Sequence, residues 1–176
     1  MPQTYFIQLI LKDHIRDVTG ERVEYSAKRY LHLDTGRVKS SKMFTVNLDI
    51  SPEEIRLFAE TVLRDPVMQD VYIGTFYPAE GFARKLLIAK RPGVTDDEGI
   101  SAQKALGDTL NREFSTHVQQ IYTADLYYFE KPVAQNDLIK LGEELLGNPL
   151  INHFEAGPVS EPITYVPDVR IETRTE

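Results

Sequence analysis

The sequence predicts an α+β fold of two repeated β-α-β(β)-α-β units, each a small antiparallel sheet with two helices on one face, packed as a pseudo-twofold pair. Two observations predict it. Residues 17–20 recur at residues 96–99, and residues 63–71 recur at residues 146–154, with the apolar positions between them in step. Strand-like and helix-like periodicities also follow the same order in both copies. Self-similarity of this kind indicates a duplicated structural unit.

The repeat also sets the expected boundaries. Residues 1–77 form repeat 1, residues 78–81 form a linker bracketed by proline and glycine, and residues 82–157 form repeat 2. Residues 158–176 contain prolines and have no amphipathic period, so we expect an extended tail or a connector. Because each repeat is near the lower size limit for a stable core, we expect the two to bury a shared face and to unfold together.

Repeat 1 begins with an alternating apolar strand at residues 5–11. A helix follows, with Asp17 or Thr19 as its N-cap, and Gly36 ends this segment. A second strand of alternating polarity is predicted over about residues 37–49. This strand, helix and second strand form the first half of the predicted β-α-β(β)-α-β unit.

The second helix of repeat 1 has the clearest start. Ser51 is the expected N-cap, Pro52 occupies the first helical position and Glu54 completes a capping box. Pro66 ends the helix, and the last strand is predicted over residues 67–76. These signals close the β-α-β(β)-α-β unit.

Repeat 2 follows the same order, and the orientation of its middle strand decides which side chains face the helices. We assign Leu126 and Tyr128 to the helix side, which leaves Thr123, Asp125 and Tyr127 on the other face. This second face is mixed in polarity in both repeats. We therefore expect it to be buried between the two halves, with an exposed platform as the alternative.

Composition excludes several classes of function. With 20 Lys+Arg against 27 Asp+Glu and a net charge of −7, the chain lacks the basic surplus that nucleic-acid binding requires. The absence of cysteine excludes disulfides, thiolate zinc sites and cysteine nucleophiles. No apolar run is long enough to span a membrane, and the N-terminus lacks the pattern of a signal peptide. We expect a cytoplasmic protein without a nucleic-acid or membrane partner.

The sequence contains no recognisable constellation of catalytic or metal-binding residues. The four histidines, which are His14, His32, His117 and His153, do not share a predicted helix face. The acidic run at residues 96–98 is interpreted as a helix cap, because carboxylates are favoured at a helix N-terminus. We predict no catalytic residue and no metal site in this chain.

Two segments resemble a known family. Residues 91–99 resemble the opening of the first helix of the PurS subunit of phosphoribosylformylglycinamidine synthase, and residues 145–154 are similar to its second helix end and last strand. Both signatures recur in repeat 1, although residues 13–14 and residues 18–19 depart from the family pattern. The positions that match at the helix starts are Asp17, Gly20, Pro92, Gly93, Asp96, Glu98 and Gly99, and those at the helix ends are Asp65, Pro66, Asn148 and Pro149.

The resemblance implies a non-catalytic assembly module that links the synthetase (PurL) and glutaminase (PurQ) components, which convert FGAR to FGAM in de novo purine biosynthesis, and that supports ammonia transfer between them. It implies no cofactor in this chain, because the partners use the ATP, Mg and glutamine, and it allows a further homo-oligomer. A fused tandem of PurS-like repeats resembles the covalent PurS pair at the N-terminus of longer PurL-type synthetases. The alternative is a tandem α+β module that senses an amino acid or a nucleotide.

Overall fold

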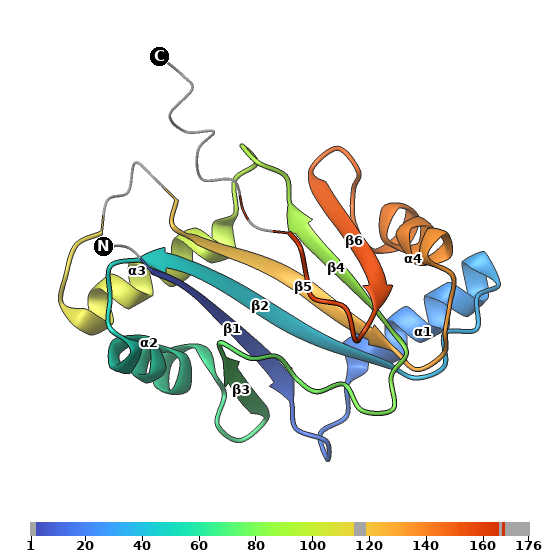
Figure 1. The fold of residues 1–176 in the computed structure, drawn as a ribbon, viewed down its shortest axis with the longest axis horizontal. Helices are drawn as coiled ribbons and strands as arrows, with labels where there is room; N and C mark the ends of the chain where they lie inside the picture. Colours follow the sequence, from blue (N-terminus) through green and yellow to red (C-terminus); the bar gives the residue numbers. More distant parts are fainter. Residues whose placement is uncertain (1–2, 115–118, 166, 168–176) are drawn as a thin grey trace.

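The computed structural model describes residues 3–114, 119–165 and 167. Within them the chain forms one antiparallel sheet of six strands, in the order β3-β1-β2-β5-β4-β6, together with four α-helices (Figure 1). We call residues 3–77 the N-terminal half and residues 82–158 the C-terminal half. Read inward from either edge, each half contributes its third, first and second strand in that order.

The N-terminal half contains β1 (Gln3–Leu11), α1 (Val18–Leu31), β2 (Val38–Leu48), α2 (Pro52–Phe58), the π-helical turn η1 (Ala59–Leu63) and β3 (Gln69–Ile73). The capping box predicted at Ser51 and Glu54 is present at the start of α2. The predicted strand over residues 37–49 is a single strand. The last strand is shorter than predicted, because a turn occupies the residues after Pro66.

The C-terminal half contains β4 (Arg84–Lys90), α3 (Asp97–Leu110), β5 (Ile121–Phe129), α4 (Gln135–Leu141), η2 (Gly142–Leu146) and β6 (Asn152–Pro158). In both halves the second helix thus continues into a π-helical turn. The closing hydrogen bonds run from Arg64 N to Ala59 O at 3.0 Å and from Gly147 N to Gly142 O at 2.8 Å. Sequence periodicity did not predict these turns, since apolar spacing does not distinguish one π turn from α-helix.

Each of the two helical core clusters contains elements from both halves. In one cluster, Val23 and Ala27 of α1 pack with Leu86 of β4 and Leu138 of α4. In the other, Leu106 of α3 joins residues of β1, β2 and α2. Each half therefore contributes its first helix to the core of the other. Because an amphipathic helix must bury its apolar face, neither half has a complete core alone.

The expectation of two separate small sheets is corrected by the pairing of β2 with β5. The two strands pair antiparallel from Val38 opposite Phe129 to Val46 opposite Ile121. The halves therefore join edge to edge and share one sheet, while the α+β class is confirmed. Edge pairing gives hydrogen-bond partners to the backbone N–H and C=O groups along β2 and β5. A face-to-face contact between two separate sheets would leave these groups unpaired.

The sheet face without helices is covered by segments predicted as a linker and a tail. In Figure 1 the β3–β4 connection and the C-terminal segment run in front of the sheet, and the helices lie behind it. Ala79, Phe82, Val159, Ile163 and Tyr165 pack on this face in one cluster with Met43, Leu87, Leu126 and Tyr128. These segments replace the expected contact between two sheet faces. Of the predicted tail, residues 166 and 168–176 lie outside the described residues.

The orientation predicted for β5 was wrong by one residue. Thr123 bonds to Asp96 at the start of α3, and Tyr127 packs with α1 and α4, so both lie on the helix side. Leu126 and Tyr128 lie on the opposite face. A shift of one residue moves every side chain of a strand to the opposite face of the sheet. Because β5 is buried on both faces, its sequence lacks the alternation that would have fixed its orientation.

Candidate functional site

The predicted motif at the start of the first helix is a hydrogen-bonded link to the sheet. The Asp17 carboxylate accepts hydrogen bonds from Gly20 N at 2.8 Å, Ser40 N at 2.6 Å and Ser40 Oγ at 2.8 Å. The same side chain therefore caps α1 and fixes it to β2. This contact sets the position of the helix relative to the centre of the sheet.

The C-terminal half repeats the arrangement at Asp96. Its carboxylate accepts hydrogen bonds from Gly99 N at 2.9 Å, Thr123 N at 2.6 Å and Thr123 Oγ1 at 2.9 Å. Asp96 is almost completely buried, and these donors compensate for the burial of its carboxylate. The acidic run at residues 96–98 thus begins with a helix cap, as predicted.

The glycine of each helix start is required by close packing. A Cβ atom on Gly20 would lie 2.2 Å from the carbonyl oxygen of Val38, and one on Gly99 would lie 2.1 Å from that of Ile121. Real Cβ atoms do not approach a backbone oxygen so closely. These two motif positions therefore keep the first helix of each half against its strand.

The other predicted helix-start positions do not join one site. Pro92 and Gly93 are exposed in the β4–α3 connection, where Gly93 has a φ of 83° that favours glycine. Glu98 instead reaches the middle of the sheet, where it accepts a hydrogen bond from Lys42 Nζ at 2.8 Å. The motif positions are thus mainly structural.

Lys42 lies at the centre of the helix-bearing face. Its Nζ is 2.9 Å from Asp125 Oδ1 and 2.8 Å from Glu98 Oε1, so it links β2 to both β5 and α3. Burial by itself lowers the Lys42 pKa, but the attraction of the two carboxylates outweighs burial and raises the pKa above its ordinary value. This cluster was not predicted from the sequence, because its members come from three separate elements.

The predicted helix-end motif of the N-terminal half forms a rigid turn. Asp65 Oδ1 accepts a hydrogen bond from Val67 N at 2.9 Å, and Gln69 Oε1 accepts one from Asp65 N at 2.9 Å. Pro66 lies between Asp65 and Val67 and cannot continue the helix. The turn is closed by side chains at both of its ends.

The same turn recurs before β6. Asn148 Oδ1 accepts a hydrogen bond from Leu150 N at 2.9 Å, and Asn152 Oδ1 accepts one from Asn148 N at 2.9 Å. Here Arg91 Nε also donates to Pro149 O at 2.8 Å and to Asn152 O at 3.0 Å. Arg91 thus anchors the turn to the end of β4.

Both turns expose aliphatic side chains. The exposed fractions are 74% for Val67, 41% for Met68, 84% for Leu150 and 37% for Ile151. In Figure 1 the turn before β3 and the turn before β6 lie on opposite sides of the molecule. Val67 and Met68 were predicted to lie in a strand, although an apolar pair directly after a helix-ending proline in both copies was an available signal.

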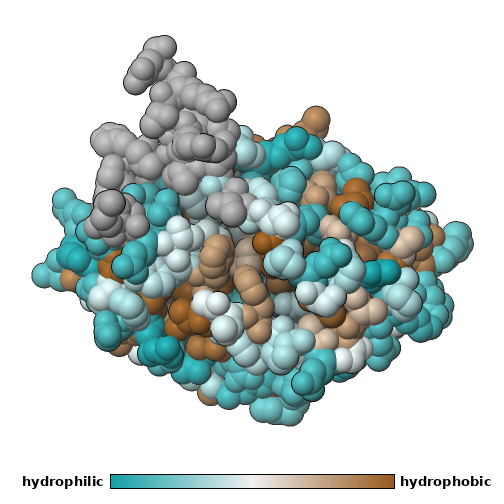
Figure 2. All heavy atoms as spheres, in the orientation of Figure 1, coloured by the Kyte–Doolittle hydropathy of each residue, from teal (hydrophilic) through white to brown (hydrophobic). Residues whose placement is uncertain are grey.

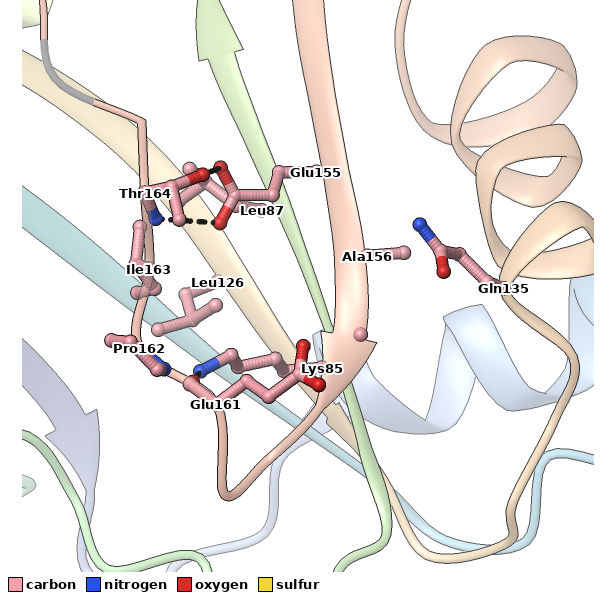
Figure 3. A pocket seen from close by; sticks show the side chains of 11 residues that line it. Lys85, Leu87, Leu126, Gln135, Glu155, Ala156, Glu161, Pro162, Ile163 and Thr164 are labelled. Atoms are coloured by element: carbon pink, nitrogen blue, oxygen red, sulfur yellow. Dashed lines mark hydrogen bonds between the residues drawn. The ribbon is translucent and has the colours of Figure 1, made fainter.

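A pocket of about 200 Å³ lies where β4 and β6 meet the C-terminal segment (Figure 3). Its lining combines apolar side chains with charged ones and includes Lys85, Leu87, Leu126, Glu155, Ile163 and Thr164. The predicted functional residues are absent from this lining. The pocket was not predicted, because the segment that closes it was assigned to an extended tail.

Hydrogen bonds hold the C-terminal segment over this pocket. Thr164 donates from N and from Oγ1 to the Glu155 carboxylate at 2.9 Å and 2.8 Å, and Lys85 Nζ donates to the carbonyl oxygen of Glu161. Burial lowers the pKa of Lys85, while the charges of Glu155 and Glu161 act in the opposite direction. The lining therefore combines one amine, whose charged form burial disfavours, with two carboxylates.

The described histidines lie apart. His14 is in the β1–α1 connection, His32 is the C-cap of α1, and His153 of β6 stacks on Tyr165 with ring centroids 4.7 Å apart. His117 lies outside the described residues. Over the described part of the chain, no group of three or more His, Asp or Glu residues is arranged to hold a metal ion. Among the same residues, no helix has the length and apolar character needed to cross a membrane.

Comparisons with known proteins do not identify a family. No protein-family model matches the chain, and no curated protein matches it.

Proposed function

We propose that this chain is a non-catalytic assembly module of phosphoribosylformylglycinamidine synthase, which links the PurL synthetase and PurQ glutaminase components and supports ammonia transfer between them. The proposal combines the family resemblance of the two signatures with the arrangement of the halves. The observation that carries it is the exchange of first helices across one continuous sheet. In this proposal the partners hold the ATP, Mg and glutamine, and the complex is cytoplasmic.

The proposal includes a duplicated unit arranged about a pseudo-twofold axis. Supporting it, the Asp17 and Asp96 caps make the same set of contacts, and the turns at Asp65 and Asn148 close with the same pattern of hydrogen bonds. The symmetric strand order of the sheet is a further support. In this interpretation the chain is a covalent form of a dimer of PurS-like units.

Covalent linkage has two physical consequences for such a module. Pairing becomes intramolecular, with an effective concentration of roughly millimolar order, so the paired form persists when the protein is dilute. The two halves are also free to diverge, whereas a homodimer must show identical surfaces twice. A fused pair is therefore suited to bind two different components, one on each side.

Reconstitution tests the proposed function. Purified chain, synthetase and glutaminase are mixed with glutamine and nucleotide and separated by size-exclusion chromatography. The proposal predicts a complex that contains all three, and predicts that the chain alone has no glutaminase or synthetase turnover. Elution of the chain apart from both components, or turnover by the chain alone, would count against it.

The pocket beside Lys85 favours one second candidate, which is a module that senses a small molecule such as an amino acid or a nucleotide. A ligand that binds only the folded state raises its stability with concentration. A thermal-melting screen against amino acids and purine nucleotides therefore separates the two candidates. A rise in Tm that is lost in Lys85→Ala would support the sensor.

A further inference from the structure

We propose that the outer edge of β3 is a self-association surface, on which a second copy of this chain pairs antiparallel about a twofold axis at Tyr72. The pairing continues the six-stranded sheet of one copy directly into the sheet of the other. It goes beyond the proposed function, because neither the synthetase nor the glutaminase takes part in it.

The outer edge of β3 has backbone groups without partners. Gly74 N donates to Phe6 O at 2.9 Å, which places Gly74 in a hydrogen-bonded pair with β1. Along an antiparallel strand, residues that bond to one neighbour alternate with residues that face away from it. The N–H and C=O groups of Val71 and Ile73 therefore point away from β1. Within the part of the chain that the structure describes, these groups have no hydrogen-bond partner, and such an edge is a template for another strand.

Large apolar side chains are exposed at both ends of this edge. Met68, directly before β3, is 41% exposed, and Phe76, after it, is 37% exposed. Figure 2 shows hydrophobic residues gathered left of centre on the lower half of the visible face, where β1 and β3 lie in Figure 1. Apolar surface beside an unpaired strand edge favours association, because pairing removes the apolar surface from water and satisfies the backbone.

A second copy fits this edge because the edge is self-complementary. With the twofold axis at Tyr72, Val71 of each copy lies opposite Ile73 of the other, and each such pair exchanges both of its N–H···O hydrogen bonds. The two Tyr72 side chains meet at the axis as a cross-strand aromatic pair. The same register places Met68 level with Phe76 of the second copy, and contacts between a thioether and an aromatic ring are favourable.

The charges along β3 are compatible with this pairing. Asp70 is the only charged residue of β3, and its Oδ1 lies 3.8 Å from Lys12 Nζ of the same copy. In the register centred on Tyr72, Asp70 lies opposite Gly74 of the second copy. Like charges therefore do not face each other along the paired strands.

The opposite edge of the sheet, β6, lacks this complementarity. Arg91 N donates to Ile151 O, which places Ile151 in a hydrogen-bonded pair with the end of β4. By the same alternation, Phe154 and Ala156 carry the outward groups of β6. Pairing two copies through these groups would place Glu155 opposite Glu155 of the second copy, and like charges directly opposite each other are unfavourable. We therefore assign the second copy to β3.

A cysteine cross-link tests the position of the axis, because the chain contains no cysteine of its own. In the proposed pairing the two Cα atoms at position 72 lie about 4.5 Å apart, a distance that a disulfide spans. The two Cα atoms at position 70 lie about 14 Å apart, because they are out of register along the strands. The full chain with Tyr72→Cys, oxidised by diamide, is expected to form a covalent dimer on a non-reducing gel at least about tenfold faster than the chain with Asp70→Cys.

The two cysteine variants differ only in their place on one strand, so random collision affects both. Equal cross-linking of the two variants would overturn the proposed register. Absence of a covalent dimer of Tyr72→Cys, in a variant that keeps a cooperative thermal transition, would overturn the pairing itself.

Sedimentation velocity of the unmodified full chain is the second test. The dimer fraction is expected to rise with concentration, and growth is expected to stop at the dimer because the twofold pairing is closed. Val71→Pro removes an outward N–H that β1 does not use, and should raise the dimer Kd at least about tenfold. Ala156→Pro, a change at an outward position of β6, is the control and should leave the Kd within about threefold.

Three results of sedimentation would contradict the proposal. The first is a wild-type chain that stays monomeric at its highest soluble concentration. The second is growth beyond the dimer, which would indicate open-ended pairing of β3 with β6 of the next copy. The third is equal weakening by Val71→Pro and Ala156→Pro, which would show that dimerisation does not use the β3 edge specifically.

Discussion

Lys42 of β2 and Asp125 of β5 face each other as the middle pair of the strand pairing that joins the halves, with four residue pairs on either side and 2.9 Å between Nζ and Oδ1. In the proposed duplication they are equivalent residues of the two repeats. In a dimer of identical units, this position would face a copy of itself and place like charges together. The fused chain instead carries opposite charges there.

Reversing one charge of this pair is expected to destabilise the protein. Asp125→Lys would place two ammonium groups opposite each other in a partly buried site, and should lower the free energy of unfolding by about 1–2 kcal/mol. Urea unfolding measures the change. The double variant Lys42→Asp, Asp125→Lys restores an attractive pair and should recover part of the loss, although the carboxylate introduced at position 42 would then face Glu98. An unchanged stability of the single variant Asp125→Lys would refute the role of the pair.

The glycines at the helix starts give a second prediction. Gly20→Ala and Gly99→Ala should each lower the free energy of unfolding by about 2–3 kcal/mol, because the added Cβ meets a backbone oxygen. Gly157→Ala is the control and should stay within about 0.5 kcal/mol, since its nearest neighbour is a carboxylate oxygen of Glu161 at 3.4 Å. Equal effects at all three positions would contradict the close-packing explanation.

Local signals predicted most of the secondary structure. The caps at Asp17 and Ser51 and the proline at position 66 act through neighbouring residues, so they can be identified from sequence alone. The joining of the halves could not be predicted in this way. It depends on the pairing of β2 with β5, which are far apart in the sequence. The hydrophobic pattern of β5 also does not show which of its faces the helices cover.

Alkaline pH provides a third prediction. Burial raises the pKa of Tyr127 and of Tyr128 to about 12. The neutral forms are thus favoured in the folded state, while the unfolded chain ionises near the ordinary value of about 10. Each tyrosine therefore contributes about 2–3 kcal/mol at most to the free energy of unfolding. This contribution is present below pH 10 and is lost as the pH rises from about 10 to 12.

Unfolding free energies measured between pH 9 and 11.5 (about the range in which free tyrosines ionise) should therefore fall steeply. Tyr127→Phe and Tyr128→Phe should each make this fall shallower, because one ionising group is removed from the unfolded chain. A tyrosinate absorbance titration gives an independent check. Ionisation of both side chains near pH 10 in the folded protein would contradict the prediction.

The exchange of first helices predicts that the halves unfold together. Differential scanning calorimetry should show one transition, with a ratio of calorimetric to van't Hoff enthalpy of about one. Residues 1–77 and residues 82–176, expressed separately, should each lack stable structure and should recover it on mixing. Two separate transitions, or a stably folded isolated half, would show that the cores are independent.

The candidate surfaces were less predictable than the fold. Leu150 and Val67 have the apolar character of strand residues, and only their position in a closed turn makes them exposed. The pocket depends on residues 159–165 lying back on β4 and β6, and nothing in the sequence of that proline-containing segment indicates such a contact. Burial and exposure at these places are properties of the tertiary structure.

The coupling of the two component activities tests the assembly role most directly. Formation of FGAM by dilute synthetase and glutaminase is measured with and without this chain, once with glutamine and once with ammonia as the nitrogen source. The assembly role predicts that the chain raises the glutamine-dependent rate and leaves the ammonia-dependent rate unchanged. A chain that changes neither rate, or raises both equally, would contradict it.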